Sequence, residues 1–219
     1  NRINTIKDTD NMYCILNGDI INNATKMSVS DVYADTLSPT NQIGKAVELF
    51  TPIKDKILLM CDGNHEARSY KAIGISPTQV IADKLGVCYT TTTWYLFLSF
   101  GRNNGRDNRK TVYSIYGCHG SGGGKTISSK AGRLEKLGDF IDADCIFHSH
   151  THTPLTFKSN KFRVDFRNRK VKEVEQTYVN TNAFLDYGGY GAVAGFSPAN
   201  KSTPVVELKG KYRDVTVRI

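Results

Sequence analysis

All five histidines of the chain follow short apolar runs that are typical of buried β-strands. They are His65, His119, His148, His150 and His152. Asp19 and Asn64 occupy the same kind of position, shortly after the runs that end at Asn17 and Cys61. In open α/β sheets the carboxyl ends of the strands meet at one edge, where ligands bind. This confinement constrains the fold more than any other feature, because histidines used as core filler would be scattered along the chain.

Strand-like and helix-like segments alternate in the first half of the sequence, and strand-like segments dominate the second half. Strands are predicted at 12–17, 56–61, 144–147, 162–166, 173–180, 205–208 and 215–219, and helices at 39–50, 77–85 and 128–141. Alternating segments at 88–100 and 111–118 flank a stretch rich in Gly, Asn and Arg, which predicts a long β-hairpin. The pattern favours an α/β sandwich with sheets inside and helices outside. Since no repeat or linker divides the 219 residues, we expect one domain over 1–219.

The composition excludes several classes of protein. With 39% hydrophobic and 23% charged residues the chain can bury a core, which rules out a disordered protein. No run approaches the roughly 18 apolar residues of a membrane span, and the polar start has no signal peptide. The five cysteines lack C-x-x-C spacing and are expected to be buried, reduced thiols. We therefore expect a cytoplasmic protein that does not bind membranes.

The residue types at the predicted sheet edge suit metal ions. A carboxylate such as that of Asp19 can bridge two ions, and neutral imidazole suits manganese, iron or zinc. The side-chain oxygen of Asn64 is a weak ligand that fits harder metals. The spacing of His150 and His152 places both side chains on one side of an extended turn. Since the set contains no cysteine, a zinc finger or ribbon is not expected.

Four ordered motifs resemble those of the calcineurin-like metallophosphoesterases, in particular the bacterial or phage phosphoesterases. They are Gly18-Asp19, Gly63-Asn64-His65-Glu66, Gly117-Cys118-His119 and Ser149-His150-Thr151-His152. Gly-Asp alone would carry no weight, but four motifs in the family's order at strand ends are a specific signal. The match spans residues 12–154, about two-thirds of the chain. The resemblance implies a four-layer αββα sandwich that holds two divalent metal ions.

The resemblance also implies which residues hold the ions. Asp19 would bridge them. Asn64, His119 and His150 would hold one ion, and His152 would help to hold the other. Mn²⁺ is the ion we expect, with iron, zinc or nickel as alternatives.

Two further motif residues would act in catalysis if the resemblance holds. His65 would bind no metal and would stabilise or protonate the leaving oxygen, and Glu66 would orient His65. The reaction implied is hydrolysis of a phosphate ester by a water that bridges the two ions. A positioned histidine acid typically contributes about 10²–10⁴-fold to such a rate.

The first motif of the family, Asp-x-His, does not occur in the 219 residues. The family places it on a strand some tens of residues before the position of Asp19, and only 18 residues precede Asp19 in this sequence. We expect that the polypeptide begins earlier and that residues 1–219 lack the N-terminal strand and first metal motif of the domain. The alternative is a degenerate member that holds one ion.

The substrate class stays open at this point. A phosphodiester, such as a nucleotide or nucleic acid, is preferred because the net charge is +8, and a small phosphomonoester is the alternative. Lys125, in the Gly-rich loop after His119, would reach a substrate phosphate unless that loop is merely flexible. A DNA nuclease of the same fold would use the cations Lys125, Lys130 and Arg133, and a non-catalytic scaffold is a third possibility.

A further concentration of positive charge lies in the late strands, between Lys158 and Lys172. Its seven cations are Lys158, Lys161, Arg163, Arg167, Arg169, Lys170 and Lys172. Enzymes of nucleic acids use such patches to neutralise backbone phosphates. A solvated face of the sheet is the alternative interpretation.

Overall fold

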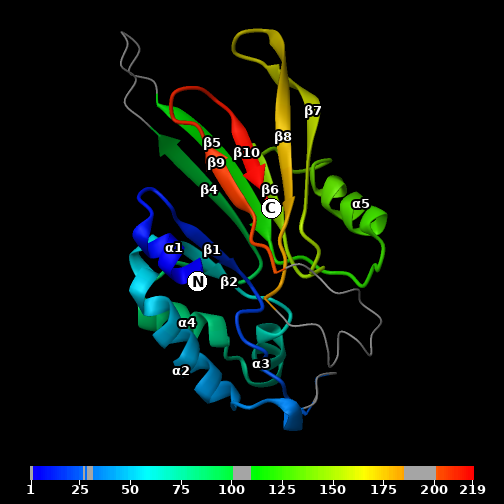
Figure 1. Ribbon diagram of the computed structural model, residues 1–219. Helices are drawn as coiled ribbons and strands as arrows, with labels where there is room; N and C mark the ends of the chain where they lie inside the picture. Colours follow the sequence, from blue (N-terminus) through cyan, green and yellow to red (C-terminus); the bar gives the residue numbers. More distant parts are fainter. Residues whose placement is uncertain (1, 27, 29–31, 101–109, 185–200) are drawn as a thin grey trace. The chain divides into compact units, whose positions relative to one another are not determined.

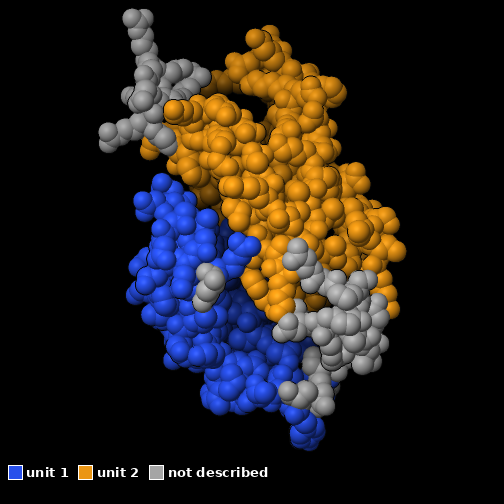
Figure 2. All heavy atoms as spheres, viewed as in Figure 1, with its two compact units in different colours: residues 1–93, 118–121 blue, residues 94–117, 122–219 orange. Residues whose placement is uncertain are grey.

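The computed structural model describes residues 2–26, 28, 32–100, 110–184 and 201–219 and has a mixed α/β architecture. The sheets formed by these residues are open, and none closes into a barrel. The chain divides into two compact units, coloured separately in Figure 2. Unit 1 holds residues 1–93 and 118–121, and unit 2 holds residues 94–117 and 122–219. The single domain over 1–219 stays a prediction, and each unit is described by itself.

Unit 1 contains a three-stranded parallel sheet in the order β1-β2-β3, of which Figure 1 labels β1 and β2. Its elements are α1 (Arg2–Asp8), β1 (Cys14–Asn17), η1 (Val32–Ala34), α2 (Pro39–Phe50), η2 (Thr51–Lys56), β2 (Ile57–Cys61), α3 (Glu66–Ile73), α4 (Pro77–Leu85) and β3 (Tyr89–Thr90). The core of the unit centres on Ile53, Met60 and Ile81, and α1 packs Ile3 and Ile6 against it. Transferring these apolar side chains out of water supplies the main stabilisation of the unit.

Helices α2 and α4 begin and end where the sequence predicts. The hydroxyls of Ser38 and Ser76 cap their N-termini by accepting N–H groups three residues later, and a proline follows each serine. Helix α4 ends at Gly86, whose φ of 70° is a left-handed conformation that glycine adopts without strain. These local signals explain why the predictions of 39–50 and 77–85 are confirmed.

Unit 2 is built on a five-stranded sheet in the order β4-β5-β6-β8-β7 and a separate hairpin, β9-β10. Its elements are β4 (Thr93–Phe100), β5 (Thr111–Cys118), α5 (Ile127–Leu137), β6 (Cys145–His148), β7 (Leu155–Asp165), β8 (Lys170–Asn180), β9 (Val205–Leu208) and β10 (Val215–Arg218). Strand β8 runs parallel to β6 and antiparallel to β7. The buried Gln176 of β8 donates to the carbonyl of Ile141, just after α5, which ties the helical segment to the sheet.

The elements of the structure differ from the predicted ones in several places, including α5, which ends at Leu137 rather than at residue 141. The alternating stretch 88–100 is not one strand, because β3 pairs with β2 in unit 1 and β4 joins the five-stranded sheet. Helices α1 and α3 were not predicted at all. The strands predicted at 162–166 and 173–180 are longer than expected, since the ladder continues from Leu155 paired with Asn180 to Asp165 paired with Lys170.

The expected hairpin and the cysteines agree with the sequence in part. Strands β4 and β5 are neighbours as a hairpin requires, and its connection, 101–109, lies outside the described residues. All five cysteines are thiols, but Cys88 is exposed and Cys14 is only half-buried, so the expectation that all are buried is wrong. Among the residues that the structure describes, no helix is both long and apolar enough to cross a membrane.

Candidate metal centre

Two loops leave the same edge of the unit 1 sheet. Strands β1 and β2 are parallel and pair Asn17 with Cys61, so the segments that follow them start side by side. Gly18 and Asp19 have φ angles of 84° and 52°, and this left-handed pair turns the chain sharply after β1. A left-handed conformation at a residue other than glycine is uncommon and clusters at functional sites. The turn carries the Asp19 carboxylate towards the loop after β2.

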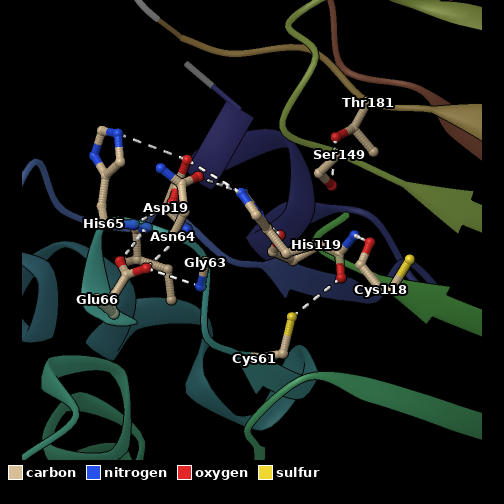
Figure 3. A network of polar contacts seen from close by, with 12 residues as sticks. Asp19, Cys61, Gly63, Asn64, His65, Glu66, Cys118, His119, Ser149 and Thr181 are labelled. Atoms are coloured by element: carbon tan, nitrogen blue, oxygen red, sulfur yellow. Dashed lines mark hydrogen bonds and ion pairs between the residues drawn. The ribbon is translucent and has the colours of Figure 1, made fainter. Parts of the chain in front are cut away.

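His119 meets Asp19 and Asn64 at this edge (Figure 3). Its Nε2 atom lies 3.1 Å from Oδ2 of Asp19 and 3.1 Å from Oδ1 of Asn64. Its Nδ1 atom lies 2.8 Å from the carbonyl oxygen of Asn17. Since a carbonyl only accepts, Nδ1 carries the proton, and the neutral ring then presents the Nε2 lone pair to the two oxygens. A metal-binding histidine is held in its tautomer in the same way.

The pKa values of Asp19 and His119 show that the two side chains interact when no metal is bound. Burial alone would raise the pKa of Asp19, but the hydrogen bond and charge of His119 outweigh burial and lower this pKa to about 2. Burial alone would lower the pKa of His119, and the Asp19 carboxylate reverses this, so the pKa is raised. In the chain without metal the Asp19 carboxylate therefore favours a proton on Nε2, between the two side chains. A divalent cation would replace that proton.

Glu66 has a different role from the predicted one. Its carboxylate is fully buried and accepts four backbone N–H groups, at 2.7–3.2 Å: those of Asp19, Ile20, Ile21 and Gly63. Its hydrogen-bond partners are therefore the backbones of the two loops rather than the ring of His65. Burial and the Asp19 charge raise the pKa of Glu66, and the N–H donors oppose that rise. Glu66 is a clamp that shapes the Asp19 loop.

His65 lies beside the candidate ligands, as its motif position predicts. Its backbone N–H donates to Oδ1 of Asp19 at 3.0 Å, and its ring Nε2 lies 3.8 Å from Oδ2 of the same carboxylate. The side chain is about one-fifth exposed, so it is open to solvent on one side. Burial lowers the pKa of His65 and Asp19 opposes this, which favours a neutral ring at pH 7.

The glycines of the two motifs are required by close packing. A Cβ atom on Gly63 would overlap the carboxylate and backbone of Asp19. A Cβ atom on Gly18 would overlap the ring of His119 and the backbone of Gly63. The two loops and the histidine therefore approach more closely than side chains at these positions would permit.

The other two candidate ligands belong to unit 2. His150 and His152 lie in the loop that follows β6, and both have left-handed backbones, with φ angles of 64° and 50°. Six residues other than glycine have positive φ in the described part of the chain, and three of these are predicted ligands: Asp19, His150 and His152. Strain of this kind persists only where the surroundings impose it.

In unit 2 the residue that imposes the left-handed backbone of this loop is Asn180, the last residue of β8. Its fully buried amide donates to Thr151 Oγ1 at 2.8 Å and to the Thr153 carbonyl at 2.6 Å. Its oxygen lies 2.9 Å from Nδ1 of His148, which must then donate the hydrogen bond. Lys130 holds the far end of the loop, donating to Thr153 Oγ1 at 2.5 Å. The loop 149–153 is thus tied to both β8 and α5.

The structure brings together five of the predicted site residues within unit 1: Asp19, Asn64, His65, Glu66 and His119. His150, His152 and Lys125 lie in unit 2, and Lys125 is exposed in the loop before α5. Lys130, expected to serve a nuclease as a phosphate contact, is buried, and burial lowers its pKa.

Sequence reasoning missed Asn17 and Asn180, which orient His119 and the 149–153 loop. Both are polar residues that end a strand, as β1 ends at Asn17 and β8 at Asn180. The rule that selected Asp19 and Asn64, a polar residue at a strand end, would have found them too.

Comparison with known proteins gave no match to this chain, whether with protein-family models, curated proteins or solved structures.

Proposed function

We propose that this chain is a metal-dependent phosphoesterase of the calcineurin-like type, with phosphodiesters as its preferred substrates. The observation that carries the proposal is the convergence of Asp19, Asn64 and His119 at the edge of the unit 1 sheet. A carboxylate, an amide oxygen and an imidazole of fixed tautomer are a donor set for manganese or iron. The proposal includes the four-layer αββα sandwich.

The residues present fit a divalent cation. Nε2 of His119 stands 3.1 Å from an oxygen of Asp19 and from that of Asn64, so one nitrogen and two oxygen donors converge on one point. The proposal adds His150 and His152 as ligands, with Mn²⁺ as the working ion and two ions in the complete site. When bound, the ions would neutralise phosphate charge and supply an activated water.

The chain's own contribution to the reaction comes from His65. Burial lowers the pKa of the His65 ring, which favours its neutral form. A phosphate anion near the ring would favour the protonated form. His65 would then hold a proton beside the leaving oxygen, while Glu66 keeps the Asp19 loop in place through its backbone contacts. This is general acid catalysis by a histidine positioned through its own backbone N–H.

The proposal is tested by hydrolysis of bis(p-nitrophenyl) phosphate with metal-stripped protein, with and without Mn²⁺. We expect turnover that depends on Mn²⁺, a loss of about 10²–10⁴-fold in kcat for His65→Ala, and unchanged Mn²⁺ binding in that variant. Asp19→Asn and His150→Ala should weaken Mn²⁺ binding measured by calorimetry. Asp83→Asn, an exposed carboxylate on α4, is the matched control and should change neither.

The outcome also separates the proposal from its alternatives. No turnover with any divalent ion, together with at most one bound ion per chain, would indicate the non-catalytic scaffold. Equal Mn²⁺ affinity in the wild type and in Asp19→Asn would show that the cluster in unit 1 holds no metal and would overturn the proposal.

A further inference from the structure

The β7–β8 hairpin of unit 2 sorts the cations of the late strands into two groups. Four of the seven have acidic partners: Lys158 with Glu175, Lys161 and Arg163 with Asp142, and Lys172 with Asp165. The other three, Arg167, Arg169 and Lys170, are exposed at the turn, and no ion pair joins them to another described residue. The positive charge available to a partner is therefore concentrated at the hairpin tip.

The tip has a defined conformation. Oδ1 of Asp165 accepts the backbone N–H of Asn168 at 3.0 Å, and Oδ2 accepts the Asn168 side chain at 2.9 Å and the Lys172 ammonium at 2.6 Å. Hydrogen bonds from Asn168 and Lys172 hold the pKa of Asp165 below its ordinary value. Arg169 is left-handed, with a φ of 49°. The three cations are thus carried on a turn that is already ordered.

Apolar side chains lie on the same hairpin as these cations, although Lys170, which pairs with Asp165, projects from the opposite face of the ribbon. Phe162 and Phe166 are 77% and 87% exposed, and Val164 and Val171, also exposed, face each other across the ladder. Directly paired residues share one face of an antiparallel sheet, and alternate residues of a strand do too, so Phe162, Val164 and Val171 form one apolar strip. An exposed apolar strip beside unpaired cations indicates a partner that is both apolar and anionic.

Three kinds of partner differ in how well they suit this arrangement. A second copy of the chain that met this one tip to tip would bring like charges together. A lipid surface would be penetrated by the turn at 166–169, but this turn sets one phenylalanine, Phe166, against two arginines and an asparagine, and the rest of the apolar strip lies behind it along the ribbon. A single-stranded nucleic acid can run along the ribbon, with phosphates near the cations and bases stacked on the rings.

We propose that the β7–β8 hairpin binds single-stranded nucleic acid through Arg167, Arg169, Lys170, Phe162 and Phe166. The inference rests on the proposed function, because it names single-stranded nucleic acid as the phosphodiester that the enzyme would hydrolyse. Strand β8 connects the tip at Lys170 to Asn180, beside the 149–153 loop, over ten residue steps or about 33 Å. A nucleic acid bound at the tip would contact a surface separate from the 149–153 loop of the same unit.

The experiment measures fluorescence anisotropy of a fluorescein-labelled 20-nucleotide oligothymidylate in EDTA, between 50 and 200 mM KCl. We expect the triple variant Arg167→Ala, Arg169→Ala, Lys170→Ala to bind at least about tenfold more weakly, with a salt slope smaller by about 2. The double variant Phe162→Ser, Phe166→Ser should lose about tenfold with the slope unchanged. The matched control Lys7→Ala, Lys54→Ala, Lys84→Ala removes the same charge from exposed sites of unit 1 and should retain most of the affinity.

Four results would overturn the inference. The first is that the wild type does not bind the oligonucleotide at micromolar protein, and the second is that the control and hairpin triple variants lose equal affinity. The third is tip-dependent binding to phosphatidylserine vesicles but not to the oligonucleotide. The fourth is self-association of the wild type that the phenylalanine variant abolishes. Circular dichroism and the thermal midpoint show whether each variant is folded. Binding without any Mn²⁺-dependent hydrolysis would count against the proposed function and leave the hairpin assignment intact, so the two failures are distinguishable.

Discussion

The Asp19 loop of unit 1 follows the half-buried strand β1, and the 149–153 loop of unit 2 follows the buried strand β6. Both loops place candidate ligands in the left-handed conformation. Each is held by one fully buried polar side chain from elsewhere in its unit: Glu66 in the first and Asn180 in the second. The Asp19 loop turns its N–H groups inwards, and only an acceptor can satisfy four of them. The 149–153 loop turns a carbonyl and a hydroxyl inwards, and an amide donates to both.

The difference shows that the chemical type of each clamp matches the backbone groups to which it hydrogen-bonds: an acceptor for N–H groups and a donor for a carbonyl. Burying a charged side chain such as Glu66 costs much free energy, but its carboxylate can accept four hydrogen bonds at once. Removing the charge leaves backbone N–H donors without an acceptor. A neutral clamp is cheaper to bury, and it can accept from His148 while it donates to the loop. The two loops should therefore respond differently to isosteric substitutions and to pH.

The largest effect is expected at Glu66. Replacing its carboxylate in Glu66→Gln turns an NH₂ group towards backbone N–H donors and leaves some of them unsatisfied. We expect a loss of about 3–5 kcal/mol in the free energy of unfolding, measured with urea, and faster hydrogen exchange at residues 18–21. Glu48→Gln, in an exposed ion pair with Lys45 on α2, should change stability by less than about 0.5 kcal/mol. Similar losses in both variants would refute the clamp.

A smaller effect is expected at Asn180. The variant Asn180→Asp keeps the shape and the acceptor for His148 but cannot donate to Thr151 and Thr153. A loss of about 2–3 kcal/mol is expected, with faster hydrogen exchange confined to residues 149–153. The exposed Asn41→Asp at the start of α2 serves as the control and should be close to neutral. If exchange rose equally at residues 18–21, the idea of two independent clamps would fail.

The smallest effect is a pH dependence that belongs to unit 1. In the metal-free protein the lowered pKa of Asp19 gives stability that is present above its unfolded value of 3.8 and is lost as pH falls towards about 2. The raised pKa of His119 gives stability that is full below 6.5 and is lost as pH rises through its folded value. The pair should therefore contribute most between about pH 4 and 6.5, by about 2 kcal/mol.

This window is measured as the difference in unfolding free energy between the wild type and His119→Gln across pH 3–9 in EDTA. The difference should shrink at both ends of the range. A flat difference would show that the two side chains are not coupled. Ionisation of the introduced carboxyl removes its remaining donor as pH rises, so the cost of Asn180→Asp should not fall between pH 6 and 9.

Much of the site in unit 1 could be predicted from sequence, because it depends on rules that act locally. A polar residue after a buried strand points to the sheet edge, and parallel pairing of β1 and β2 brings Asp19 and Asn64 together. The helices with serine caps and a following proline were found for the same reason. Those signals lie within a few residues of the feature that they predict.

The parts that were not predicted depend on distant backbone groups. The role of Glu66 follows from the direction of N–H groups some 45 residues away in the sequence, which no side-chain pattern records. Helix α3 leaves Tyr70 and Ile73 exposed and buries only Glu66, so its apolar residues do not mark a side that faces the core. Helix α1 does place Ile3 and Ile6 on the core, but two isoleucines in a polar stretch are a weak signal. Parallel pairing of β8 with β6 likewise cannot be read from alternation.

The way Trp94 packs gives the protein a built-in optical probe. Trp94 is the only tryptophan of the chain, it is 5% exposed, and its indole lies against Gly117, where a Cβ would overlap it. Unit 2 begins at Trp94, and the chain leaves that unit after Gly117. Intrinsic fluorescence excited at the indole band therefore follows the opening of unit 2 alone. Its emission, compared with circular dichroism of the whole chain, would reveal whether the two units melt in one transition or two.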